Sequence, residues 1–168
     1  MRWLNTTALG LSVLLLAGCG FHLRGQAELT PELRVIYVQS QQGIGMPPGV
    51  LGRKLPTVLA SNGVTVTRDP TQATAIITIL NEGGGRRTMA ADRFDVKREY
   101  SLVYSAVYDV KLSGGRVLIG AEGVSANRAV LFDENRVLGF EAAQESLTDN
   151  MAEEMAWQIL RRLQAVKS

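Results

Sequence analysis

The chain has 168 residues, of which 46% are hydrophobic and 20% are charged, and its formal net charge is +2. This is the balance of an ordinary globular protein, and a charge so near zero argues against a dedicated nucleic-acid binder. The sequence contains one cysteine, which excludes a disulfide within the chain.

The N-terminus has the pattern of a secretory signal peptide. Arg2 lies beside the N-terminal amine, residues 8–17 are almost wholly apolar, and small residues precede Cys19. The apolar stretch is shorter than the ~20 residues that a membrane-spanning helix needs, so a spanning helix is the weaker interpretation. We predict that residues 1–18 are a cleaved lipoprotein signal peptide.

The single cysteine is predicted to carry a lipid anchor. Residues 16–19, LAGC, resemble the bacterial lipobox, in which cleavage precedes the cysteine. The resemblance implies acyl chains on the Cys19 thiol and on its new amine, and two or more chains give stable membrane attachment. The alternative is a free or disulfide-forming cysteine. Gly20, where lipoproteins of the inner membrane typically have aspartate, implies by the same resemblance an outer-membrane destination.

The mature chain is predicted to comprise a lipidated N-terminus and linker, residues 19–33, and a single domain, residues 34–168. The domain begins with a strand at residues 34–39, RVIYVQ, which are β-branched and aromatic. Glycine and proline in residues 41–49 predict a loop.

A helix is predicted after this loop. Apolar residues recur at helical spacing from Leu51 to Leu59. Because proline removes a helix hydrogen bond, we expect the helix to start near Gly52, so that Pro56 falls close to its first turn. Asn62-Gly63 is a typical helix stop, and residues 64–67 alternate as a strand.

Residues 75–80, AIITIL, predict a further strand, and the glycine-rich segment 82–87 that follows is a flexible loop or a bulge in a longer strand. Strict alternation from Tyr100 to Leu112 predicts a long half-buried strand, with Val103 and Val107 as apolar exceptions on its polar face. A turn at residues 113–115 then leads to a partner strand at residues 116–130.

The end of the chain predicts an amphipathic helix. Its apolar stripe contains Leu147, Met151, Met155, Ile159 and Leu163, with Phe140, Ala143 and Leu160 flanking it. The methionines could form an adaptable binding groove, but their spacing favours core packing. The elements together predict an α+β fold, in which an antiparallel or mixed sheet of four to five strands carries two helices on one face. The other face is left to solvent or to a partner.

No arrangement of residues indicates catalysis, a metal site or a cofactor. His22 is the only histidine, and it lies beside the predicted anchor. Glu153 and Glu154 are neighbours on the predicted helix and point in different directions. We therefore expect a protein that is not an enzyme.

A basic segment lies between two predicted strands. Its cations are Arg86, Arg87, Arg93, Lys97 and Arg98. At the tip and flanks of a hairpin they could hold an anionic ligand, because guanidinium groups bind phosphates in bidentate fashion. The alternative is a solvated loop.

The chain resembles the family of the LPS-assembly lipoprotein LptE. The most specific similarity is residues 18–25, GCGFHLRG, and residues 98–110 and 158–163 are also similar. The resemblance implies an outer-membrane lipoprotein that plugs the β-barrel protein LptD, assists its assembly and binds lipopolysaccharide during transport to the outer leaflet. The alternative function is a lipid-anchored periplasmic scaffold of another envelope system.

The resemblance also implies ligand-binding positions. A family basic residue corresponds to Arg93, which together with the other four cations forms the candidate lipopolysaccharide site. The second basic position of the family corresponds to Phe140, which is not basic, and Arg136 is a candidate substitute.

Overall fold

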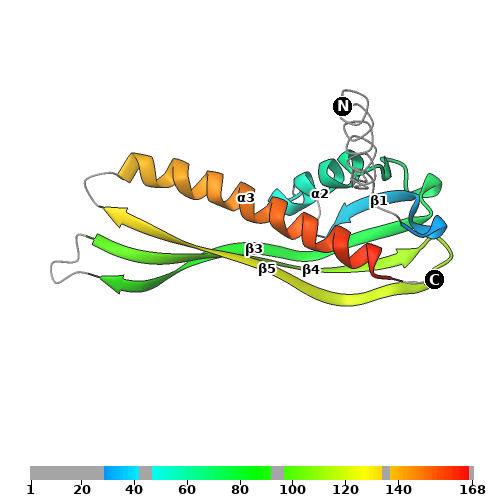
Figure 1. The fold of residues 1–168 in the computed structure, drawn as a ribbon. Coiled ribbons are helices and arrows are strands. Elements are labelled where there is room, and N and C mark those ends of the chain that lie inside the picture. Colours follow the sequence, from blue (N-terminus) through cyan, green and yellow to red (C-terminus); the bar gives the residue numbers. More distant parts are fainter. Residues whose placement is uncertain (1–28, 42–46, 92–96, 134–136, 167–168) are drawn as a thin grey trace, which may run out of the picture.

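The computed structural model describes residues 29–41, 47–91, 97–133 and 137–166, and within these ranges the side chains of residues 91, 97, 98, 132, 133, 137 and 138 are not described. Cys19 and His22 therefore lie outside the described part of the chain. The described residues form a long twisted sheet with two helices on the same face (Figure 1).

The strands form one mixed sheet in the order β2-β1-β3-β4-β5. The strands are β1 (Val35–Ser40), β2 (Thr65–Thr67), β3 (Ala75–Ala91), β4 (Lys97–Leu112) and β5 (Val117–Asp133). β1 runs parallel to β2 and β3, whereas β3, β4 and β5 are antiparallel. Parallel pairing needs a crossover connection, and the helix α2 (Val50–Ser61) provides the one between β1 and β2. The predicted α+β class, with two helices on one face, is confirmed.

The packed body begins before the first strand. Pro31–Leu33 forms a 3₁₀ turn, Leu33 is completely buried, and Leu29 packs against the core. Residues at the end of the predicted linker therefore contribute apolar burial to the domain.

α2 begins earlier than the sequence predicts. It starts at Val50 after the N-cap Gly49, slightly before the predicted start near Gly52, so Pro56 lies further inside the helix than expected. The cause is a distant cap, because the Glu82 carboxylate accepts hydrogen bonds from the backbone N–H groups of Leu51 and Gly52. The predicted stop is confirmed by Asn62 at the C-cap and by Gly63, whose φ of 83° favours glycine.

β3 is much longer than the predicted strand at residues 75–80. It continues through the glycine-rich segment to Ala91 and pairs with β4 along its length, with irregularities between Ile79 and Asn81 and between Thr88 and Ala90. Glycine disfavours strands locally. The paired backbone of β4 overrides that preference, so segment 82–87 is part of a long strand and not a loop.

The alternation predicted for β4 is confirmed. Inward-facing side chains are at most 8% exposed, and they are Tyr100, Leu102, Tyr104, Ala106, Tyr108 and Val110. Val103 and Val107 are 38% and 37% exposed on the other face. The turn into β5 contains Gly115, with a φ of 84°.

The final helix, α3 (Val137–Gln164), lies along the sheet (Figure 1). Met151, Met155, Ile159 and Leu163 are at most 1% exposed, so the methionines are core residues, as their spacing favoured. Ala143 is exposed, contrary to its predicted place beside the stripe. A repeat of four residues drifts around a helix that has 3.6 residues per turn, so one straight stripe cannot face the sheet along the whole of α3.

Polar side chains of α3 follow the outer edge of β5. Residues four apart on the helix meet residues three apart on the strand, and the pairs are Arg162 with Glu122, Gln158 with the Ser125 carbonyl, and Glu154 with Arg128. An unpaired strand edge can recruit other strands. These three contacts hold α3 in register along β5, and one of them occupies a backbone carbonyl of this edge strand.

Candidate functional site

The candidate site lies where the three long strands extend beyond β1 and α2 as a ribbon covered by α3 (Figure 1). Glu82 lies at the base of this ribbon and is buried, with only 7% of its surface exposed. Glu82 Oε2 accepts hydrogen bonds from the Leu51 N–H at 2.9 Å and from the Tyr104 hydroxyl at 2.7 Å, and Oε1 accepts one from the Gly52 N–H at 3.3 Å. This carboxylate therefore ties β3 to β4 and to the start of α2.

The Tyr104 hydroxyl of this junction stays protonated well above neutral pH. Burial, the hydrogen bond to Glu82 and the negative charge of Glu82 together raise the pKa of Tyr104 to about 12, so its hydroxyl remains a donor at neutral pH. A Cβ at Gly49 would lie 2.3 Å from the Glu82 carboxyl carbon. Glu82 is structural, and the sequence analysis missed it because its partners are about thirty residues away.

The glycines after Glu82 make room for an aromatic ring. A Cβ at Gly84 would lie 2.9 Å from the ring of Tyr104 and 3.2 Å from the Val103 carbonyl oxygen. A Cβ at Gly83 or Gly85 would meet no atom within 4 Å. Gly84 alone of the three is therefore required by packing.

The structure divides the predicted basic cluster. Arg86 and Arg87 are consecutive residues of β3, so their side chains leave opposite faces of the sheet. Lys97 and Arg98 are the first two residues of β4, and their side chains are not described. Arg93 and Arg136 lie outside the described residues. Of the five predicted cations, the structure therefore places two side chains, and it places them on different faces.

Arg86 is held on the helix-covered face by aromatic rings. Its guanidinium carbon lies 5.4 Å from the centroid of the Tyr100 ring, within the range of a cation–π contact. Tyr100 in turn contacts Phe140 at the start of α3, with ring centroids 6.0 Å apart and planes tilted by 53°. Phe140 is 6% exposed. Phe140 thus supports Arg86 indirectly, through Tyr100.

A hollow of about 320 Å³ lies beside Arg86, between β3, β4 and α3. Its polar walls include Gln144 and Thr148, and the Thr148 hydroxyl donates to the Gln144 carbonyl oxygen at 2.8 Å. A guanidinium at the mouth of a polar hollow can bind a phosphate or another anion without covalent chemistry. The sequence contains a signal for this site, since Arg86 ends the glycine run.

The described residues bring together no three His, Cys, Asp or Glu side chains that could hold a metal ion. Of the buried acids there, Glu82 has hydrogen-bond donors around it, and Asp109 Oδ2 pairs with the Lys111 ammonium at 2.9 Å while the buried Asp109 Oδ1 has no hydrogen-bond partner. Among the described helices, none is long and apolar enough to cross a membrane.

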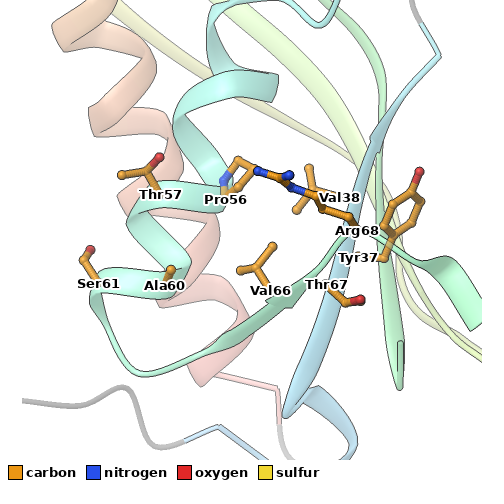
Figure 2. A pocket seen from close by; sticks show the side chains of 9 residues that line it. All are labelled: Tyr37, Val38, Pro56, Thr57, Ala60, Ser61, Val66, Thr67 and Arg68. Carbon is orange, nitrogen blue, oxygen red and sulfur yellow. The ribbon is translucent and has the colours of Figure 1, made fainter. Parts of the chain in front are cut away.

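The uncovered face of the three-stranded ribbon carries few charges and many small side chains. Strand alternation and register place the following residues on it: Asn81, Gly83, Gly85, Arg87, Ser101, Val103, Ser105, Val107, Gly123, Ser125, Asn127 and Ala129. Small side chains let another surface approach the sheet closely. A larger groove lies elsewhere, between α2, β1 and β2, with a volume of about 760 Å³ (Figure 2).

Comparisons with known proteins agree with this architecture. Residues 33–163 match the family model described as LptE, Lipopolysaccharide-assembly. The LPS-assembly lipoprotein LptE of Yersinia enterocolitica is 31% identical over 161 residues, which are 94% of this chain and 74% of the relative. The protein of the same name from Photorhabdus laumondii is 27% identical over 96% of this chain and 85% of its own length.

Solved structures show the same fold. The solution structure of an uncharacterized lipoprotein B from Nitrosomonas europaea has a TM-score of 0.68 at 24% identity, over 87% of this chain and 91% of that one. A minor lipoprotein from Acinetobacter baumannii has a TM-score of 0.62 at 17% identity, over 79% of this chain and 92% of that one. At these identities the likeness is one of fold.

Proposed function

Because the chain belongs to the LptE family of lipopolysaccharide-assembly proteins, we propose that it is an outer-membrane lipoprotein that plugs and assists assembly of the LptD β-barrel and binds lipopolysaccharide on its way to the outer leaflet. The observation that carries this proposal is the family match, which spans the packed body from Leu33 to Leu163. Relatives named as LPS-assembly lipoproteins support it over nearly the whole chain.

The anchor in this proposal is the lipidated Cys19. Acyl chains on its thiol and amine hold the protein at the periplasmic leaflet, while residues 19–28 allow the body to reach its barrel. Ten residues span at most about 35 Å when fully extended. The domain therefore stays within a short distance of the membrane surface.

The ribbon suits the inside of a barrel. Strands of 16 or 17 residues reach roughly 55 Å at ~3.3 Å per residue, which exceeds the hydrocarbon thickness of a bilayer. Barrel interiors are polar. A face of mostly small side chains, on which Arg87 is the one cation that the structure places, can lie against such a wall and bury few charges, which supports its role as the barrel-facing surface.

Lipopolysaccharide carries phosphates, and the basic end of the ribbon offers cations to them. Arg86 is oriented by Tyr100 at the mouth of a polar hollow, and Arg93 belongs to the short connection between β3 and β4. In this proposal, Arg93, Arg86, Arg87, Lys97 and Arg98 give this end of the sheet its positive charge, with Arg86 on the helix-covered face and Arg87 on the other. Phe140 supports the site through Tyr100.

The partner is tested by affinity purification of the tagged full-length chain from outer membranes solubilised in a mild detergent. We expect a stoichiometric outer-membrane β-barrel identified by mass spectrometry as LptD. Recovery of the lipoprotein with a different envelope system, or alone at every detergent concentration, would contradict the proposal.

The ligand site is tested by Arg93→Asp. We expect binding to immobilised lipopolysaccharide to fall about tenfold, because loss of one attractive ion pair and gain of repulsion are worth roughly 1.4 kcal/mol. Arg161→Asp, at an exposed position near the other end of α3, is the matched control and should bind normally. Equal binding by both variants would remove Arg93 from the site.

A further inference from the structure

The groove between α2, β1 and β2 is the largest hollow described above, and the proposed function does not use it. Its floor is apolar and consists of Val38 in β1 and Val66 in β2, both half-buried. Pro56 and Ala60 of α2 form the facing wall. Its volume of about 760 Å³ lies in the usual range of ligand sites, roughly 300–1,000 Å³.

The groove exists because the sheet is wider than the helix that covers it. The buried face of α2, which includes Leu55 and Leu59, points to the core. β2 lies at the edge of the sheet and pairs only with β1, so its apolar side chain at Val66 remains incompletely covered. Pro56 and Ala60 lie on the flank of α2 that borders this uncovered strip.

Arg68 supplies a positive charge to the groove, which is also lined by the hydroxyl residues Thr57, Ser61 and Thr67. Figure 2 shows its side chain reaching from the end of β2 across the groove to Pro56. Arg68 makes no hydrogen bond or ion pair with another residue of the described part of the chain. Its neighbour Asp69 makes no ion pair with it, and the Asp69 carboxylate instead accepts hydrogen bonds from the Thr71 backbone and hydroxyl at 2.9 and 2.7 Å.

We propose that this groove binds a single acyl chain that ends in an anionic phosphate or carboxylate head group. The chain lies along Val38, Val66 and Ala60, and the Arg68 guanidinium binds the head group. Burying apolar surface against an apolar strip supplies the affinity. The planar guanidinium, which makes paired hydrogen bonds to oxyanions, supplies the preference for a negative charge.

An acyl chain fits this groove better than a polypeptide strand does. A peptide that extended the sheet would need a row of backbone partners, and β2 has only three residues. An acyl chain makes no backbone hydrogen bonds, and it requires only an apolar channel with a charged end. The inference does not depend on the identity of the barrel partner or on the basic end of the ribbon.

The test uses the full-length lipidated chain in phosphatidylcholine nanodiscs, with valine methyl groups labelled with ¹³C for NMR. The probes are octyl phosphate, inorganic phosphate and octyltrimethylammonium. We expect saturable shifts of the Val38 and Val66 methyl signals with octyl phosphate, and none with inorganic phosphate. The Val103 methyls on the uncovered face should not respond, because they lie on the opposite side of the sheet.

Variants at Arg68 decide the role of its charge. Arg68→Glu should weaken octyl phosphate binding about tenfold, because the head group is then repelled. It should strengthen octyltrimethylammonium binding, because that cationic head group is then attracted. Arg68→Lys keeps the charge but loses the paired hydrogen bonds, so it should weaken octyl phosphate binding less than Arg68→Glu does. An unchanged spectrum of the buried Val110 methyls reports that each variant is folded.

Ala60→Trp is expected to fill the groove and to abolish binding of octyl phosphate. The proposal is overturned if octyl phosphate causes no saturable shift at Val38 and Val66, or if the wild type and Arg68→Glu bind it equally. Inorganic phosphate binding as tightly as octyl phosphate would overturn it too, because the acyl chain would then contribute nothing. These outcomes leave the LptD and lipopolysaccharide proposals unaffected.

Discussion

Removing the Glu82 carboxylate should substantially lower the free energy of unfolding of the domain. In Glu82→Ala, the Leu51 and Gly52 N–H groups lose their cap and the buried Tyr104 hydroxyl loses its acceptor. Loss of a helix cap costs about 1 kcal/mol, and an unsatisfied buried hydroxyl costs about 1–3 kcal/mol. We expect the free energy of unfolding to fall by about 3 kcal/mol, a large fraction of the 5–15 kcal/mol that is typical of a domain.

Urea unfolding of the mature chain, followed by far-ultraviolet circular dichroism, measures this loss. Hydrogen exchange at the Leu51 and Gly52 amides should also accelerate, because both lose their acceptor. Glu82→Gln keeps the shape but has only one acceptor oxygen, so an intermediate loss of about 2 kcal/mol is expected. Glu153→Ala, at an exposed position of α3, is the control and should change stability by less than about 0.5 kcal/mol.

A double-mutant cycle isolates the link between Glu82 and Tyr104. With phenylalanine at position 104, no hydroxyl is left unpaired, so Glu82→Ala should cost about 1 kcal/mol less than it does in the wild type. The reasoning is refuted if Glu82→Ala changes stability no more than Glu153→Ala does. It is also refuted if the exchange rates at Leu51 and Gly52 remain those of the wild type.

Three further perturbations test the packing around the candidate site. Gly84→Ala should lower stability by about 1–3 kcal/mol in urea unfolding because its Cβ meets the Tyr104 ring, whereas Gly85→Ala, which points into open space, should be neutral or slightly stabilising. Raising the pH from 10 to 12 should destabilise the fold. The pKa values of Tyr104 and Tyr108 are raised from 10.0 to about 12 in the folded state, so in this range mainly the unfolded state releases these protons. Unfolding curves measured at pH 9 and pH 11 check the direction of the effect. Phe140→Ala should lower the free energy of unfolding by about 3 kcal/mol. It should also weaken binding to immobilised lipopolysaccharide, because Tyr100 loses its contact with the Phe140 ring. Unchanged binding would show that this ring contact does not orient the site.

Local patterns in the sequence determined the elements that depend on near neighbours. The alternation of β4, the first strand at residues 34–39, the Asn62-Gly63 helix stop and the core role of Met151 and Met155 were all predicted correctly. Each depends on side-chain period or on backbone preference within a few residues, which a sequence displays directly. The family resemblance likewise depended on short segments, and the family match confirmed it.

Tertiary structure alone decided the features that join distant segments. The early start of α2 depends on Glu82, the length of β3 on the backbone of β4, and the support of Arg86 on the contact between Tyr100 and Phe140. The groove beside Arg68 arises because β2 extends past the edge of α2. In every case the controlling energy comes from partners many residues away, which pairing and packing bring together and which no local pattern encodes.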